Sequence, residues 1–260
     1  MKRKISLTVC VIVLCSLLLV GTVKAGNPAY GITEMPSVTT AVVDGKWTST
    51  DEWTDTVRVD MSGNGSGAFG YNIQDFTNLG LEWIVEFYTD NTNNTGDYWQ
   101  ILIDSPNAGG AAPNSGDYKI EITGHTTLKL YQGNGAGWTE VAPAAGELTW
   151  ANTIAASPWN SNPHWILEIV DSSKTTGTLQ TGQPPNGLGV TAFDASNSKY
   201  IAWAPNARAN VPDSWGVIAD YSTTNTAPEG ITFVAILISS SVAMLGAFYY
   251  LRKQPKAKST

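Results

Sequence analysis

Apolar and polar residues alternate over long stretches in the middle of the chain. In the segment 81–88, every second residue from Leu81 to Phe87 is apolar, and Glu82 and Glu86 fall between them. The same period of two recurs in residues 118–123, 128–131 and 164–170. A period of two is typical of β-strands that bury one face, so we expect the glutamates of these strands to face solvent.

Other apolar segments predict further strands and an all-β fold. Residues 99–104 alternate less strictly, which indicates a central strand. Additional strands are expected near Ala41, Val57, Leu148, Val190, Ile201 and Val217. Glycine- and asparagine-rich turns separate these segments, and Gly124-His125 predicts a tight hairpin. No segment before residue 231 has a helical period. Together the pattern predicts an antiparallel β-sandwich of jelly-roll type over residues 41–219.

Both ends of the chain carry targeting signals. Residues 1–25 have a basic start, an apolar stretch and a small-residue cleavage site, which predict a signal peptide; an uncleaved anchor is the alternative. Residues 231–251 are uncharged and apolar for 21 positions, enough to cross a bilayer as a helix, and a basic tail follows at 252–260. We therefore expect a single-pass cell-membrane protein with its N-terminal domain outside the cell. Residues 26–40 would form a lead-in and 220–230 a short stalk.

The predicted mature domain is more acidic than the whole chain. Four of the 15 Lys and Arg lie in residues 1–25 and four in 252–260. Seven therefore remain against 21 Asp and Glu once Glu229 is set aside, a charge of about −14. Such a domain repels nucleic acid and suits cations or neutral ligands. Both cysteines, Cys10 and Cys15, lie in the signal segment, so the mature domain has no thiol chemistry.

Short motifs resemble a known family of sugar-binding domains. Residues 43–47 (Val-Asp-Gly-Lys-Trp) and 51–55 (Asp-Glu-Trp-Thr-Asp) resemble the opening of carbohydrate-binding module family nine and of related DOMON-like domains. Residues 98–104 and 116–121 match as well, so the resemblance spans about 42–215. It implies a β-sandwich that usually binds sugars, with calcium in some members. DOMON relatives hold haem or sugar, but no methionine or histidine here stands in a haem motif.

Tryptophans placed in predicted loops are the candidates for sugar stacking. An indole can stack on the C–H face of a pyranose while amide, carboxylate or guanidinium groups bind its hydroxyls. The alternative is that these rings cap the ends of the core; Trp83, Trp99 and Trp165 are assigned to the core and Trp53 to packing. The candidate ligand-binding residues are Trp138, Trp159, Trp203, Trp215, Asn134, Asn206, Arg208 and Asp213.

Two groups of oxygen-bearing side chains are candidates for calcium. The loop 90–97 carries Asp90, Asn94 and Asp97, and calcium takes six to eight oxygen ligands from such groups. Asp104 and Asp117 form a second candidate cluster. The alternative for the loop is a polar hairpin connection, because it lacks the glycine and glutamate of an EF-hand.

Two sequons predict N-glycosylation in loops, at Asn64 and Asn93.

The functional prediction is a membrane-anchored surface protein that binds glycan or polysaccharide. No nucleophile elbow, zinc-spaced histidine pair or phosphate-binding loop is present, so we do not expect an enzyme. The alternative is a structural envelope component or adhesin that contacts neighbouring envelope proteins without binding sugar. The C-terminal layout resembles PEF-CTERM-type sorting signals of archaeal surface proteins, although Gly230 departs from that pattern. Removal of the helix by a sortase-like enzyme and a permanent anchor both stay open.

Overall fold

The computed structural model describes residues 26–33, 35–37, 41–73, 80–105, 107–172, 177–181 and 185–219. The chain divides into two compact units, Met1–Asp220 and Tyr221–Thr260, and the described residues all belong to the first. The predicted signal peptide, stalk, membrane helix and basic tail lie outside the described residues. Within the described part of the chain, no helix is long and apolar enough to span a bilayer.

The described residues are almost entirely strands and turns. The strands are β1 (Gly31–Thr33), β2 (Val59–Gly63), β3 (Gly67–Ile73), β4 (Leu81–Phe87), β5 (Tyr98–Asp104), β6 (Asp117–Thr123), β7 (Thr127–Gly133), β8 (Trp138–Val141), β9 (Leu148–Ala155), β10 (His164–Asp171), β11 (Asn186–Asp194), β12 (Lys199–Trp203) and β13 (Gly216–Ala219). One 3-10 turn, Pro212–Ser214, precedes β13. The fold is all-β, as predicted.

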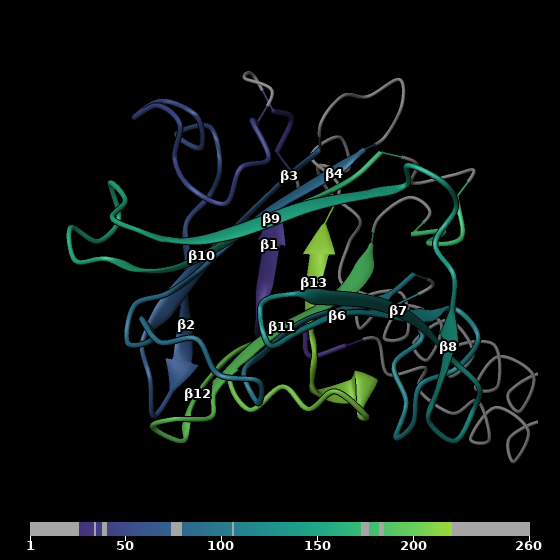
Figure 1. Cartoon of the computed structure of the whole chain (residues 1–260). Coiled ribbons are helices and arrows are strands. Elements are labelled where there is room, and N and C mark those ends of the chain that lie inside the picture. The colour runs from purple at the N-terminus through teal and green to yellow at the C-terminus, as the bar shows by residue number, and fades with distance from the viewer. Residues whose placement is uncertain are drawn as a thin grey trace, which may run out of the picture. The chain divides into compact units, whose positions relative to one another are not determined.

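The strands form two layers packed against each other (Figure 1). Sheet A has the order β8-β7-β6-β5-β11-β12, and β13 pairs with the start of β11 and with β1. Sheet B has the order β2-β3-β4-β10-β9. Strand β2 pairs with β3 in sheet B and, through its last two residues, with β12 in sheet A. Among the strands of the described residues, every pairing is antiparallel except that of β1 with β13, which is parallel.

The core lies between the sheets and uses the alternating apolar residues of both. Trp83, Trp99 and Trp165 are all buried there, which confirms their assignment to the core. Strand β5 lies between β6 and β11, so the central position predicted for 99–104 is also confirmed.

The outer side of sheet B is covered, contrary to the expectation that its strand acids face solvent. Glu86 and Glu168 have 0 % of their surface exposed and Glu82 has 1 %. The segment 41–56 lies over this side and donates hydrogen bonds to Glu86 and Glu168. Strands β4 and β10 are therefore buried on both faces.

Hydrogen bonds to the two fully buried glutamates fix this covering segment. The Glu168 carboxylate accepts the Trp53 indole N–H at 2.9 Å and the backbone N–H groups of Asp44 and Gly45 at 2.9 and 2.8 Å. Glu86 accepts the indole N–H of Trp47 at 2.7 Å. Burial raises the pKa of Glu168 to about 7, although these hydrogen bonds act in the opposite direction.

The strand expected near Ala41 is absent, because residues 41–58 run over sheet B as irregular structure and turns. Three strands were not predicted from the sequence: β1, β3 and β8. Strand β3 is buried at every position and rich in glycine, so it has no polar alternation to reveal it. Strands β1 and β8 are only three and four residues long.

Two glycines with similar backbone angles test how closely the covering segment approaches sheet B. Gly45 has φ +79° and Gly146 has φ +76°. A Cβ atom at Gly45 would lie 2.6 Å from the Asn152 backbone, whereas at Gly146 nothing lies within 4 Å. We expect Gly146→Ala to cost about 1 kcal/mol of unfolding free energy through backbone strain alone. Gly45→Ala should cost about 2 kcal/mol more through overpacking. Equal losses in denaturant titrations would contradict the close approach.

Candidate functional site

The outer face of sheet A carries a continuous row of hydrogen-bonded side chains. The Thr191 hydroxyl donates to Gln100 Oε1 at 3.0 Å, and Gln100 Nε2 donates to Glu121 Oε2 at 2.7 Å. Lys119 Nζ donates to the same Glu121 oxygen at 2.8 Å. These four residues, here called the polar ladder, alternate with core residues on β11, β5 and β6 and so project outward.

Aromatic rings border the polar ladder. Lys119 Nζ lies 4.1 Å from the centre of the Tyr131 ring and 5.8 Å from that of Trp138. The rings of Tyr98 and Phe193 stack at 5.4 Å between centroids. Tyr131, Trp138, Tyr98 and Phe193 are each partly exposed. The face therefore presents both ring surfaces and hydrogen-bonding groups to solvent.

The polar ladder is close to electrically neutral. Burial raises the pKa of Glu121, but hydrogen bonds from Lys119 and Gln100 outweigh burial and hold the pKa below its usual range. Glu121 is thus ionised at neutral pH and paired with the Lys119 ammonium group. A ligand on this face would meet paired charges and an amide.

Two of the four candidate indoles lie together at one end of this face. Trp138 begins β8, and its ring is parallel to that of Trp215, with an interplanar angle of 8° and centroids 6.4 Å apart. Trp138 Nε1 donates to Asn210 Oδ1 at 2.8 Å. Trp215 is fully buried, packs with Leu102, and donates its indole N–H to the Arg208 carbonyl. Only Trp138 of this pair has a partly exposed ring.

The other two indoles lie elsewhere. Trp203, expected in a loop, is the last residue of β12 and points into the core, with 5 % exposure and its ring against Phe69. Trp159 packs edge-on against Trp47 at the outer side of sheet B. Stacking on a ligand needs an open ring face, and burial leaves Trp203 and Trp215 without one.

The candidate polar partners also divide between places. Asn134 lies in the turn before Trp138 and donates to the Thr139 hydroxyl. Asp213 accepts the backbone N–H of Gly110 at 2.7 Å. Asn206 and Arg208 line an open pocket of about 520 Å³. The pocket residues are Asn27, Tyr200, Pro205, Asn206, Ala207, Arg208 and Ser214.

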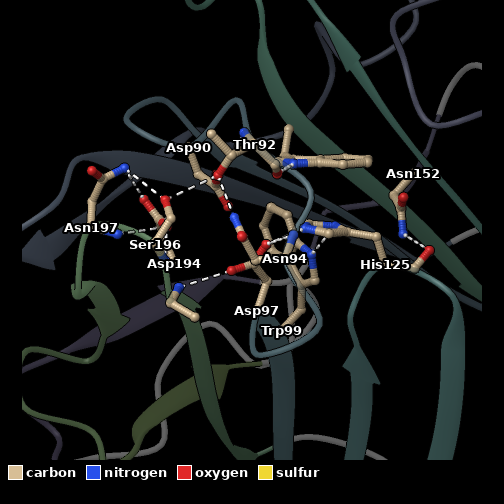
Figure 2. A network of polar contacts seen from close by, with 12 residues as sticks. Asp90, Thr92, Asn94, Asp97, Trp99, His125, Asn152, Asp194, Ser196 and Asn197 are labelled. Atoms are coloured by element: carbon tan, nitrogen blue, oxygen red, sulfur yellow. Dashed lines mark hydrogen bonds and ion pairs between the residues drawn. The ribbon is translucent and has the colours of Figure 1, made fainter.

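At one end of the sandwich, Asp90 and Asp97 of the predicted calcium loop meet His125 (Figure 2). Their ligand atoms all lie within 4.8 Å of one another. His125 Nε2 lies 3.1 Å from Asp97 Oδ2, and the imidazole stacks on Trp165 at 3.6 Å. Asn94 directs its amide to the Thr92 hydroxyl. Sequence reasoning did not include His125, which enters the cluster from the hairpin turn between β6 and β7.

The donor set of this cluster is a poor match for calcium. Both Asp97 oxygens already accept backbone N–H groups, from Asn94 and Ala195 at 2.8 Å each. Two carboxylates and one imidazole are ligands typical of zinc or manganese, whereas calcium prefers more numerous oxygens. Burial raises the pKa of Asp90 to about 6, and burial lowers that of His125. The hydrogen bonds instead join the loops around residues 90–97, 125 and 194–197.

Asp104 and Asp117 form a separate pair at the other end of β5. They lie directly opposite each other on β5 and β6, and both are fully buried. Asp104 accepts the N–H groups of Ala108 and Gly109, and Asp117 that of Asn114. Burial and the neighbouring Asp104 charge raise the pKa of Asp117 to about 7. The predicted calcium residues therefore lie in two separate clusters, in line with the two candidate groups of the sequence.

The two sequon asparagines are both exposed. The Asn64 amide is engaged, since Nδ2 donates to the Ser198 carbonyl and Oδ1 accepts the Tyr200 N–H. Glycosylation at Asn64 and Asn93 stays a prediction.

Sequence reasoning missed the ladder residues, although they occupy the polar positions of predicted strands. Lys119 and Glu121 were recognised as the polar face of 118–123, and Gln100 lies in 99–104. Their meeting depends on β6, β5 and β11 being neighbours in that order. The alternation predicted each strand, but nothing in the sequence predicted the order in which the strands pair.

Comparisons with known proteins support the fold. No protein-family model matches the chain, and no curated protein matches it. A solved carbohydrate binding module family 9 from Caldicellulosiruptor kristjanssonii in complex with glucose has a TM-score of 0.51 and 14 % sequence identity. The match covers 76 % of this chain and 100 % of the module's chain. The corresponding complex with cellotriose has a TM-score of 0.49 and 13 % identity, covering 76 % and 98 %. The chain has a fold like that of family 9 carbohydrate-binding modules.

The Asp104–Asp117 pair predicts a specific pH dependence. The pKa of Asp117 is raised from 3.8 to about 7, so the folded protein keeps a proton that the unfolded chain releases. Stability from this group is full below about pH 4 and is lost as the pH rises toward 7. We expect the unfolding free energy of Asp117→Asn, relative to that of the native protein, to rise by on the order of 1 to 2 kcal/mol from pH 5 to pH 8. Denaturant titrations at both pH values measure this change. Asp60→Asn, an exposed control, should show no such change.

Calcium binding is tested by the melting temperature. Because the Asp97 oxygens accept loop N–H groups, we expect neither EDTA nor added calcium to shift the melting temperature. A rise with calcium that Asp97→Asn or Asp117→Asn abolishes would contradict this and establish the ion site predicted from the sequence.

Proposed function

We propose that the domain binds carbohydrate on the outer face of sheet A, across the polar ladder. The observation that carries the proposal is the ladder itself, a row of polar side chains linked across three strands and bordered by aromatic rings. Gln100 and Glu121 in the middle of the row are partly open to solvent, whereas Thr191 and Lys119 are buried. The covering segment closes the opposite sheet, which leaves this face as the broad surface suited to a ligand.

The chemistry of the face matches that of a neutral sugar. Hydroxyl groups both donate and accept, so they can bind the Gln100 amide and the Glu121 carboxylate. The C–H face of a pyranose can pack on the Trp138 or Tyr131 ring. These groups are tied to one another by the hydrogen bonds of the ladder, so little side-chain freedom is lost on binding.

The similar fold gives independent support. The family 9 module that resembles this chain is described in complex with glucose. Because one fold can host unrelated functions, the residues of the face carry the argument and the fold adds to it.

The face supports binding better than hydrolysis. Glycoside hydrolysis generally needs two carboxyl groups placed across the scissile bond. The polar ladder has one carboxylate, Glu121, and Lys119 and Gln100 both engage it. We therefore propose a non-catalytic binding module.

The proposed location rests on the sequence alone. We propose that residues 231–251 anchor the chain in the cell membrane and that the domain is displayed outside, where polysaccharides are accessible. An envelope or adhesin role through protein contacts is the competing proposal.

A matched pair of indoles tests the binding face. Trp138 lies at the polar ladder and Trp159 at the outer side of sheet B, and both are partly buried. We expect Trp138→Ala to weaken binding of a soluble glucan or xylan about tenfold, the loss expected for one stacking contact. Trp159→Ala should bind normally. Affinity electrophoresis and calorimetry on the folded domain measure both.

A second substitution separates binding from folding. Gln100→Ala removes an amide from the middle of the ladder without emptying an aromatic site, so we expect weaker binding with a nearly native melting temperature. Failure of the unaltered domain to bind any glycan, together with ordered self-assembly, would favour the envelope role.

A further inference from the structure

An open pocket adjoins the polar ladder. Tyr200 lines this pocket, and its side chain lies against that of Thr191, the first residue of the ladder. Its hydroxyl also donates to the Ala207 carbonyl at 2.8 Å, which fixes one wall. The pocket and the ladder therefore share a boundary, and a chain of linked sugars could occupy both.

Arg208 gives the pocket a positive charge without a carboxylate to neutralise it. Arg208 is exposed and makes no ion pair with any described residue. By contrast, Lys46, Arg58, Lys119 and Lys129 each pair with an aspartate or glutamate. The residues that line the pocket include no Asp or Glu. In so acidic a chain, an unpaired guanidinium in a pocket points to an anionic ligand.

The backbone that carries Arg208 is held on both sides. Its N–H donates to the Ser214 hydroxyl at 2.9 Å. Its carbonyl accepts the Trp215 indole N–H at 2.9 Å and the Val211 N–H at 3.0 Å. A fixed backbone lowers the entropy lost when the side chain engages a ligand. Arginine also presents a planar set of donors that fits a carboxylate or sulfate in bidentate fashion.

Amide groups add to this set of donors. Asn27 and Asn206 line the same pocket, and each side-chain amide can donate to an anionic oxygen. Asn206 adopts φ +65°, a left-handed conformation that asparagine tolerates better than most residues. Donors from two segments of the chain, at residue 27 and at residues 206–208, thus line the pocket.

We propose that this pocket binds the anionic group, carboxylate or sulfate, of an acidic glycan whose neighbouring sugar lies on the polar ladder. The proposal rests on the carbohydrate-binding function and adds the ligand class and the residue that selects it. The ladder is neutral and accepts uncharged sugars, so preference for an acidic glycan comes from Arg208. The negative charge of the whole domain acts at longer range and is screened beyond about 8 Å at physiological salt.

Binding of neutral and acidic polysaccharides tests the proposal. The intact domain would be titrated at physiological salt with xylan as the neutral probe, polygalacturonate as the carboxylate probe and dextran sulfate as the sulfate probe. We expect tighter binding of at least one acidic probe than of xylan. Arg208→Gln should weaken that binding about tenfold, the effect of one charge-assisted pair, and leave xylan affinity unchanged. Arg208→Lys keeps the charge but loses the planar donors, so intermediate binding is expected.

Arg58 provides the matched control. It is paired with Asp60 and lies beside Trp159, at the covered sheet. Arg58→Gln removes the same charge but should leave every affinity unchanged. If Arg58→Gln and Arg208→Gln weaken acidic binding equally, the effect is one of net charge and the pocket proposal is wrong.

The outcomes separate this proposal from the one on which it rests. Binding of xylan without any preference for an acidic probe, or a preference that Arg208→Gln leaves intact, overturns the pocket proposal alone. Absence of binding to all three probes overturns both. A preference for polygalacturonate over dextran sulfate, or the reverse, identifies which anionic group the pocket takes.

Discussion

The hydrogen bonds that two buried glutamates accept from the covering segment determine which outer side of the sandwich is covered and which stays open to solvent. A carboxylate removed from water is costly unless its oxygens find donors. Glu168 finds three, from Trp53 and the backbone of residues 44 and 45, and Glu86 contacts Trp47, Ser157 and His164. Because either partner left alone would be an unsatisfied polar group, the segment and sheet B stabilise each other.

The covering segment makes the outer sides of the two sheets differ in what they expose. Trp53 packs on Ile84 and Ile166 and converts the outer side of sheet B into a second small core. Sheet A has polar side chains at comparable outward positions, but they satisfy one another across the strands, and Gln100 and Glu121 stay partly exposed. One sheet thus serves stability, and the other is left with the groups that a ligand can reach.

The loops at the two ends of β5 are held by carboxylates in a similar way. Asp97 receives N–H groups from two loops and faces His125, while Asp104 and Asp117 gather the N–H groups of the loop between β5 and β6. An acid-rich sequence can resemble a cation site when its oxygens serve as acceptors for backbone N–H groups. The requirement to satisfy buried donors accounts for the hydrogen bonds that these aspartates accept.

The sequence by itself determined where most strands lie and the all-β class, because a period of two is a local property. The weaker alternation of 99–104 likewise indicated that β5 lies inside a sheet. It also supplied the motif residues 43–47 and 51–55, but not the face that they cover. Tertiary structure decided that Glu82, Glu86 and Glu168 are buried. The covering segment reaches Glu86 from 39 residues away in sequence and Glu168 from 123 residues away. It likewise placed Trp203 in the core and Arg208 beside the polar ladder. Strand order, which depends on long-range packing, joined Thr191 to Gln100 and Glu121.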